Sequence, residues 1–306
     1  MDLRKLKKQS IFRANFEESL NLEDDGIVKL QQEQHEKTAK FFKNGHASLW
    51  FRIRSLILSL IFPIGFNFFV LIVSMELHES KTLTLPIAKH ESLTVNVFLI
   101  LLLIWLSFVV IGKWVKRAYL LPYRYQFHVF TFMIWFLLEI DLVVFDILLA
   151  NLSTFEIIAI YGIMMIATYM LFTIALAGLR KLMYAEAEIS GDTFRNKIAK
   201  MISLYGMAIL GIGILIKHIL GIFSLDVSTS IKAFGFLLMW IFCNIVVIAV
   251  SAFIGLPYFL QAYYKWKYPE EYRDWEGKAV EEWYGKKYLK KHRELLEAKN
   301  EEKINL

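Results

Sequence analysis

Long apolar runs alternate with short charged segments along this chain, and their lengths predict helices that cross a membrane. A helix of about 20 residues spans the hydrocarbon core of a bilayer. Two of the apolar stretches carry charged residues, and four contain no Asp, Glu, Lys, Arg or His: Ser55–Met75, Ser92–Gly112, Ile157–Leu179 and Ala233–Tyr264. We therefore predict an all-α polytopic integral membrane protein with six transmembrane helices, at about 54–75, 93–112, 127–149, 155–178, 201–224 and 232–258.

The basic residues between these runs predict the orientation of the helices. Cytoplasmic loops of membrane proteins are enriched in Lys and Arg. Residues 113–125 hold four basic residues and no acid, and residues 179–200 hold five basic residues and three acids. Both segments and both tails are then cytoplasmic, an N-in and C-in topology. A five-span alternative that discards 127–149 puts one basic loop on the wrong side.

The ends of the chain are charged and predict tails outside the membrane. The division is a cytoplasmic N-terminal tail at 1–53, a transmembrane domain at 54–260 and an aromatic, charged C-terminal helix at 261–306. We expect amphipathic helices in both tails. Trp and Tyr prefer the headgroup level of a bilayer, whereas the same amphipathic pattern also serves protein partners. The C-terminal helix therefore either lies along the inner leaflet or forms a docking surface for a cytoplasmic partner.

Composition narrows the class of protein. Hydrophobic residues make up 57% of the 306 residues, which leaves little chain for a soluble catalytic domain. The net charge is +6, and the excess basic residues flank the spans. We therefore expect them to set the orientation of the helices and to contact anionic lipid, and not to bind nucleic acid. The single cysteine, Cys243, excludes an intramolecular disulfide. Lys outnumbers Arg, Pro is scarce, and Ile and Phe are abundant, a bias common in AT-rich bacterial genomes, so we expect a bacterial cytoplasmic (cell) membrane.

Acidic residues in the span at 127–149 are the strongest candidates for function. Ionised groups in hydrocarbon are costly and are usually paired or functional. At about 1.5 Å per residue, Glu139 and Asp141 lie about 18 and 21 Å from the inner end, and Lys217 of the span at 201–224 lies about 24 Å in. We predict an ion pair between Lys217 and one of these acids. It is either a structural staple or part of a proton- or ion-coupled switch that includes His218.

Other residues in the spans favour packing roles. Glycines that share a helical face with Lys217 permit close approach of a neighbouring helix: Gly206, Gly213 and Gly221. Asn244 is expected to form an interhelical hydrogen bond. Pro63 and Pro257 are expected to kink their helices.

The loop after the first span contains two His-Glu-Ser sequences, which include His78 and His90. Imidazole and carboxylate can bind a divalent metal. Neither His-Glu pair continues as HExxH, so a solvated polar hairpin is the favoured interpretation and these two histidines are weak metal candidates only.

The functional prediction is a permease-like component of a transport or export system, working alone or with a separate ATPase. The sequence has no GxxxxGK[ST], GxSxG or HExxH motif, so any ATP hydrolysis needs another chain, and we expect no cofactor. The alternative from another class is a non-transporting interaction protein, an immunity or regulatory factor that binds another membrane protein. An intramembrane enzyme built from Glu139, Asp141 and His218 is a third, weaker hypothesis.

Overall fold

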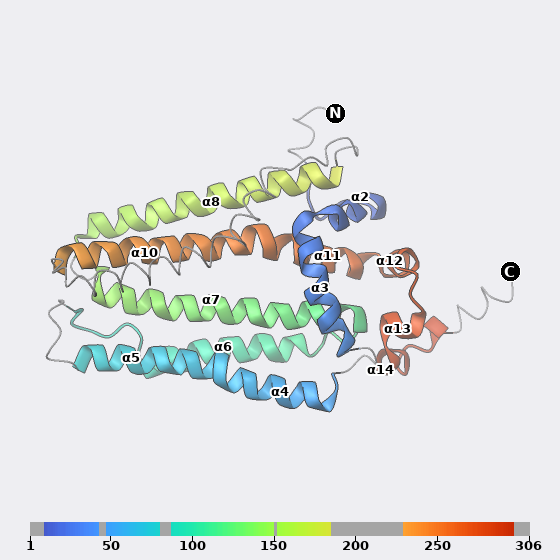
Figure 1. Cartoon of the computed structure of the whole chain (residues 1–306), viewed down its shortest axis with the longest axis horizontal. Helices are drawn as coiled ribbons and strands as arrows, with labels where there is room; N and C mark the ends of the chain where they lie inside the picture. Colours follow the sequence, from blue (N-terminus) through green and yellow to red (C-terminus); the bar gives the residue numbers. More distant parts are fainter. Residues whose placement is uncertain (1–8, 43–46, 80–86, 150–151, 185–228, 297–306) are drawn as a thin grey trace, which may run out of the picture.

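The computed structural model describes residues 9–42, 47–79, 87–149, 152–184 and 229–296. Its regular elements in these ranges are all helices (Figure 1). The long helices lie side by side and form a bundle. They are α4 (Leu49–Ser59), η2 (Leu60–Phe66) and α5 (Asn67–Glu79), which form one continuous rod, then α6 (Val95–Gly112), α7 (Leu121–Ile147), α8 (Thr154–Tyr184), and a second rod of α10 (Thr229–Val250), η6 (Ser251–Gly255) and α11 (Leu256–Lys267).

Five helices in the described part of the chain are long and apolar enough to cross a membrane: Leu49–Glu79, Val95–Gly112, Ala118–Ile147, Thr154–Tyr184 and Phe234–Lys267. Large apolar side chains on their outer surfaces are exposed, as Ile158, Met165 and Ile166 of α8 illustrate. Such a surface is stable in lipid and not in water. The chain is therefore a helical membrane protein.

The predicted span at 201–224 lies outside the described residues. The candidates on it share that position and are not placed by the structure: Gly206, Gly213, Lys217, His218 and Gly221. Five of the six predicted spans thus coincide with described helices, and the sixth stays a prediction.

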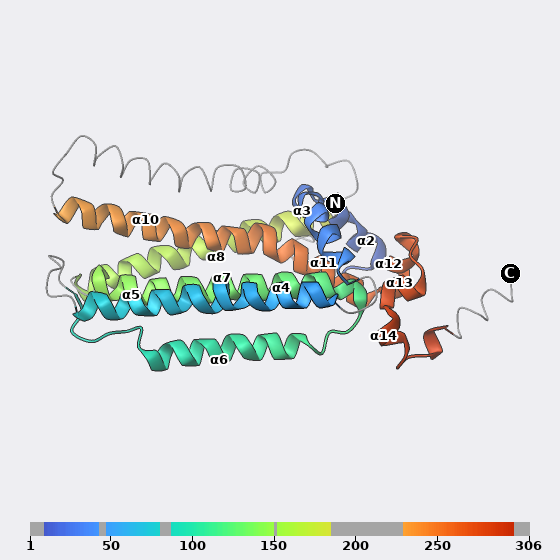
Figure 2. The ribbon, with the colours of Figure 1, turned by 60° about the horizontal axis from the view of Figure 1, so that its bottom comes forward.

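Short helices gather at one end of the bundle. They come from the beginning of the chain, from the segment before α7 and from the end of the chain: α2 (Phe16–Leu20), η1 (Asn21–Asp24), α3 (Gly26–Lys40), η3 (Ala118–Leu120), α12 (Pro269–Trp275), α13 (Val280–Tyr284) and α14 (Lys286–Leu289). In Figure 1, α3 crosses the long helices and α12 to α14 lie beyond their ends. In Figure 2, α6 lies apart from α8 and α10, on the far side of α4 and α5.

Four of the five long helices exceed the thickness of the hydrocarbon core, and the extra turns of α8 and α11 help build this end. α8 has 31 residues, about 46 Å of helix, against a hydrocarbon core of about 30 Å. The largest cluster of buried apolar residues joins the end of α8, α11, the start of α7 and the short helices. We call this region the head, residues 9–40, 115–123, 176–184 and 256–296, and we call the rest of the long helices the bundle.

The two proline positions coincide with changes in helix type. Pro63 lies within the π-helical η2, and Pro257 follows the π-helical η6. The backbone N–H of Asn67 bonds to Ile64, and the Asn67 side chain donates to the carbonyl of Pro63 at 2.6 Å. The side chain thus gives a backbone carbonyl of the irregular turn a hydrogen-bond donor, one of the ways in which helix interruptions are accommodated in lipid.

The end of the chain does not form the single helix that its pattern predicts. Helices α12, α13 and α14 are separated by turns, and Gly277 and Gly285 have backbone φ angles of 63° and 80°. Glycine adopts this left-handed region readily, and other residues rarely do. The turns fold α13 back toward η3, where the ring of Trp283 stacks on Tyr119 with 4.3 Å between centroids.

Candidate functional site

Asp141 of α7 connects two long helices through neutral hydrogen-bond donors. Its Oδ1 accepts from Nε1 of Trp240 at 2.7 Å and from Nδ2 of Asn244 at 2.9 Å, both on α10. Trp240 and Asn244 are one helical turn apart, so they face α7 together. Tyr161 of α8 packs edge-on against Trp240, with 6.2 Å between ring centroids. The described partners of Asp141 are therefore amide and indole groups.

Glu139 lies two residues away and faces the opposite side of α7. Its side chain is fully buried, and its Oε1 accepts from Nε1 of Trp135 at 2.6 Å. Its Oε2 is buried and has no hydrogen-bond partner among the described residues. Trp135 belongs to the apolar cluster that joins α7 to α5 and α6. The two acids therefore sit in different helix interfaces, because residues i and i+2 do not share a helical face.

Asp146, at the end of α7 away from the head, fastens a loop and a second helix. Its carboxylate accepts from the backbone N–H of Ser92 at 2.7 Å and from the Ser92 hydroxyl, and its backbone carbonyl accepts from the N–H of Ala88 at 2.8 Å. His78 at the end of α5 places Nε2 3.6 Å from the same carboxylate. Asp146 is fully buried. This arrangement joins α5, the 87–93 loop and α7, and we call it the outer staple because it lies at the end of the bundle away from the head.

The outer staple separates the two histidines that were weak metal candidates. His78 contacts Asp146, whereas His90 is exposed. No group of three His, Cys, Asp or Glu side chains able to hold a metal occurs in the part of the chain that the structure describes.

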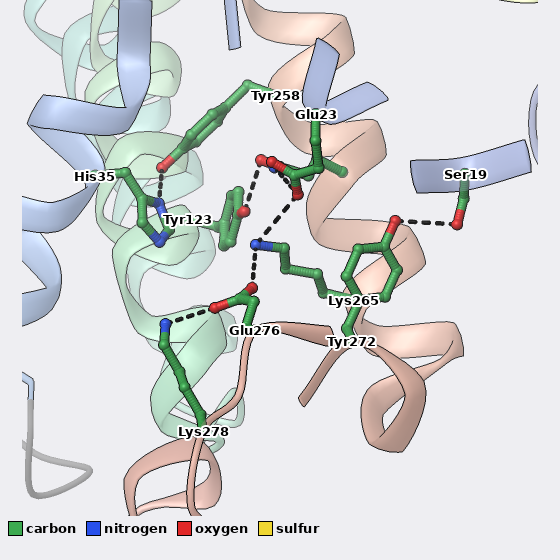
Figure 3. Close-up of polar contacts among 10 residues, drawn as sticks. Ser19, Glu23, His35, Tyr123, Tyr258, Lys265, Tyr272, Glu276 and Lys278 are labelled. Carbon is green, nitrogen blue, oxygen red and sulfur yellow. Dashed lines mark hydrogen bonds and ion pairs between the residues drawn. The ribbon is translucent and has the colours of Figure 1, made fainter. Parts of the chain in front are cut away.

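A second polar network lies in the head (Figure 3). Lys265 of α11 donates to Glu276 at 2.7 Å and lies 3.6 Å from Glu23 of η1. Gln261 donates to the same Glu23 at 2.5 Å and accepts from the hydroxyl of Tyr123 at 2.7 Å. The Lys265 side chain is 10% exposed, so this is a buried ion network with a cation between two acids. It connects the beginning of the chain to α7 and α11.

The N-terminal segment is further held by tyrosine hydroxyls. Tyr264 donates to the carbonyl of Ile11 at 2.5 Å and accepts from the N–H of Ala14 at 3.1 Å. Tyr184 of α8 donates to the carbonyl of Ser10 at 2.6 Å, and Tyr272 donates to the Ser19 hydroxyl at 3.0 Å. The backbone of this segment thus obtains partners that a helix or sheet would otherwise supply.

Burial and the charges of Lys265 and Lys278 determine the pKa values of neighbouring groups in the head. Burial, together with the charge of Lys265, lowers the pKa of His35 from 6.5 to about 3. Its Nδ1 lies 3.0 Å from the Tyr258 hydroxyl, so His35 is a neutral partner of that tyrosine. Burial alone would raise the pKa of Glu276, but Lys265 and Lys278 outweigh it, and the pKa lies below its ordinary value. The acid is therefore ionised near neutral pH.

The head network was not anticipated from sequence. Lys265 and Glu276 lie in a segment whose many charges have the composition of a solvated helix, and Glu23 is 242 residues from Lys265. One signal was present: Lys265 directly follows the apolar run Ala233–Tyr264 and belongs to the same continuous helix.

Comparisons of this chain with protein-family models, with curated proteins and with solved structures found no match. Function therefore has to be argued from the site.

Proposed function

We propose that the protein is a permease-like component of a transport or export system in a bacterial cytoplasmic membrane, with six spans and with both tails in the cytoplasm. The head then lies inside the cell. The basic residues near it support this side, because Lys113, Lys116 and Arg117 all follow α6 at the head end.

The placement of the described helices supports an even number of crossings. α4 begins at the head and α11 ends there (Figure 1). α8 ends at the head, whereas α10 begins at the opposite end of the bundle. A crossing between α8 and α10 is the prediction made for residues 201–224.

The observation that carries the transport proposal is the position of the two acids of α7. Asp141 contacts α10, and Glu139 lies in the interface with α5 and α6. Each is held by neutral donors in the described part of the chain. A proton or cation gained at either acid changes the charge at one of the two interfaces of α7, which gives coupled transport a physical basis. The predicted pairing of Lys217 with one of them belongs to the same proposal.

The energy source is either an ion gradient or a separate ATPase, since the chain has no P-loop motif. An ATPase would bind the protein from the cytoplasm, and the head is the surface that it meets. Lipid surrounds the bundle in either case.

Transport is tested with purified protein in liposomes, together with any stoichiometric ATPase that purifies with it in mild detergent. Currents are recorded while pooled solutes are applied across an imposed proton gradient. We expect a solute-dependent current that falls at least tenfold in Asp141→Asn and in Glu139→Gln. The control Glu76→Gln removes an exposed acid of α5 and should retain the current.

The alternative, an interaction protein, predicts a different result. Liposomes with the complete set of purified components then carry no solute-dependent current, and the protein purifies with a stoichiometric toxin, sensor or secretion subunit. The buried tyrosine contacts that give the head a fixed surface are the observation that favours this candidate. The absence of a solute-dependent current, together with such a stoichiometric partner, would contradict the permease proposal.

A further inference from the structure

The interface of α5, α6 and α7 contains buried polar atoms that lack partners. Besides Oε2 of Glu139, they are Oδ1 of Asn67 on α5 and Nε1 of Trp105 on α6, each without a hydrogen-bond partner in the described residues. Asn67 and Glu139 are fully buried, and Trp105 is 6% exposed. Unpaired polar atoms at such burial are uncommon in folded proteins and call for a physical explanation.

Aromatic contacts join the segments that carry these atoms. Phe66, next to Asn67, packs on Phe136 of α7 with 6.3 Å between ring centroids, less than one turn from Glu139. The rings of Trp105 and Trp135 pack with 5.7 Å between centroids, and Phe98 packs on Trp135 at 5.9 Å. Aromatic rings therefore enclose the indole N–H that donates to Glu139.

The described helices around Glu139 lack the charges that would balance it if it were ionised. α6 carries no Asp, Glu, Lys, Arg or His along its length, and α5 carries none before Glu76. On α7, Asp141 faces α10, His128 lies eleven residues away, and Asp146 is engaged in the outer staple. An uncompensated buried charge is far more costly than a buried neutral group.

We propose that Glu139 is a proton-binding site, with the proton held on Oε2 while Oε1 accepts the hydrogen bond from Trp135. The proposal rests on the proposed function in one respect, since it makes the proton the coupling ion of the carrier. It also leaves Asp141 as the acid for the predicted pairing with Lys217. The neutral acid leaves one weakly polar group unpaired, whereas the carboxylate would leave a full charge with a single neutral donor.

The geometry favours a proton over a metal ion as the occupant. Dehydrated hard cations take about six oxygen ligands. The apolar cluster around Trp135 consists of aromatic and aliphatic side chains, and no metal-capable group of acids and histidines occurs in the described residues. A proton needs one oxygen atom, and Oε2 supplies it.

Infrared difference spectroscopy of the full-length protein in lipid tests the protonation state directly. We expect a carboxylic acid C=O stretching band at neutral pH that shifts on exchange into D₂O and is lost in Glu139→Gln. The band should persist in Asp141→Asn and in Glu76→Gln. A spectrum in which the band is absent, or is unchanged in Glu139→Gln, would overturn the proposal.

Thermal stability in detergent provides a second measurement. Glutamine is isosteric with the neutral acid and still accepts from Trp135, so Glu139→Gln should melt within about 2 °C of the wild type at neutral pH. A large loss of melting temperature in Glu139→Gln at neutral pH, together with a wild type that loses stability in acid, would show an ionised, paired Glu139 and contradict the proton site.

The two proposals fail separately. A Glu139-dependent band without any solute current retains the proton site and removes the transport function. A solute current without the band retains transport and removes the proton site.

Discussion

The head and the bundle bury ionisable groups in different ways. In the head, Lys265 lies between Glu23 and Glu276, and opposite charges compensate each other. In the bundle, Glu139 and Asp141 accept hydrogen bonds from indole and amide groups within the described residues. The difference follows from the surroundings. The head forms next to water, where carboxylates and ammonium groups are already ionised, whereas in lipid a neutral group is easier to bury.

The head and the bundle also differ in the size of their buried apolar clusters. The largest buried cluster is in the head, and the bundle contains smaller clusters between α5, α6 and α7 and between α7, α8 and α10. Water drives apolar side chains together, and lipid provides no such force between helices. Helices in the bundle must therefore be held by close packing and by polar contacts. At Gly112 an added Cβ would lie 2.7 Å from the ring of His128, which shows how closely α6 approaches α7.

Breaking the compensation in the head should have the largest effect. Lys265→Met removes the cation that lies between the buried carboxylates of Glu23 and Glu276 and should lower the free energy of unfolding by about 3–5 kcal/mol. Denaturant titration in detergent, followed by tryptophan fluorescence to which the buried Trp283 contributes, measures the loss. The control Lys278→Met removes a lysine whose side chain is 41% exposed and should cost less than about 1 kcal/mol. Equal losses in the two variants would contradict a buried network.

Weakening the outer staple should have an intermediate effect and should act on the bundle alone. Ser92→Ala removes the hydroxyl that donates to Asp146, and hydrogen bonds to charged groups contribute about 1.5–3 kcal/mol. The melting temperature in detergent should fall, with increased hydrogen exchange in residues 87–93. Ser107→Ala serves as the control, because that exposed hydroxyl bonds only to Leu103 of its own helix. A fall of the same size in Ser107→Ala would remove the role of the staple.

Acid should destabilise the head by a smaller amount at mildly acidic pH. The pKa of His35 is about 3 in the folded protein and 6.5 as the ordinary value, so between these values the unfolded chain binds more protons. Stability is therefore complete above about pH 6.5 and decreases as the pH falls toward 3. The loss at about pH 5.5 should be about 1.4 kcal/mol.

The measurement for His35 compares unfolding curves between about pH 7 and 5, a range above the titration of Glu276. The His35→Gln variant should lose this pH dependence, whereas His292→Gln, which replaces an exposed histidine of the same region, should keep it. A wild-type curve that is flat in this range would show that His35 is accessible to protons in the folded state.

The sequence predicts the bundle much better than the head. Runs such as Ser92–Gly112 carry the signal for their own helices, because transfer into lipid depends on the residues of one segment. The head depends on contacts between distant segments, such as Tyr264 with Ile11, and these leave no local pattern. The interruptions at Gly277 and Gly285 were also missed, since glycine is compatible with a helix until tertiary contacts favour a turn.

Some residues of the candidate site could also be identified from sequence, whereas their partners could not. Glu139 and Asp141 could be selected from sequence because charge is rare in apolar runs. Their opposite facing follows from helical periodicity, but Trp240 as a partner of Asp141 does not, because Trp is expected anywhere in such a run. The outer staple combines Ser92 and His78 from the two His-Glu-Ser sequences around Asp146, which no spacing rule reveals.

The tyrosine contacts with the N-terminal segment set an order for biosynthesis. Ile11 and Tyr264 are separated by 253 positions, and a ribosome adds about 5–20 residues per second. The early segment therefore waits on the order of 10 to 50 seconds after its own synthesis before its partner exists. During that interval the apolar helices enter the membrane one after another, so insertion is nearly finished before the head can close. Closure of the head thus marks the arrival of α11, and an interrupted chain lacks the residues that complete it.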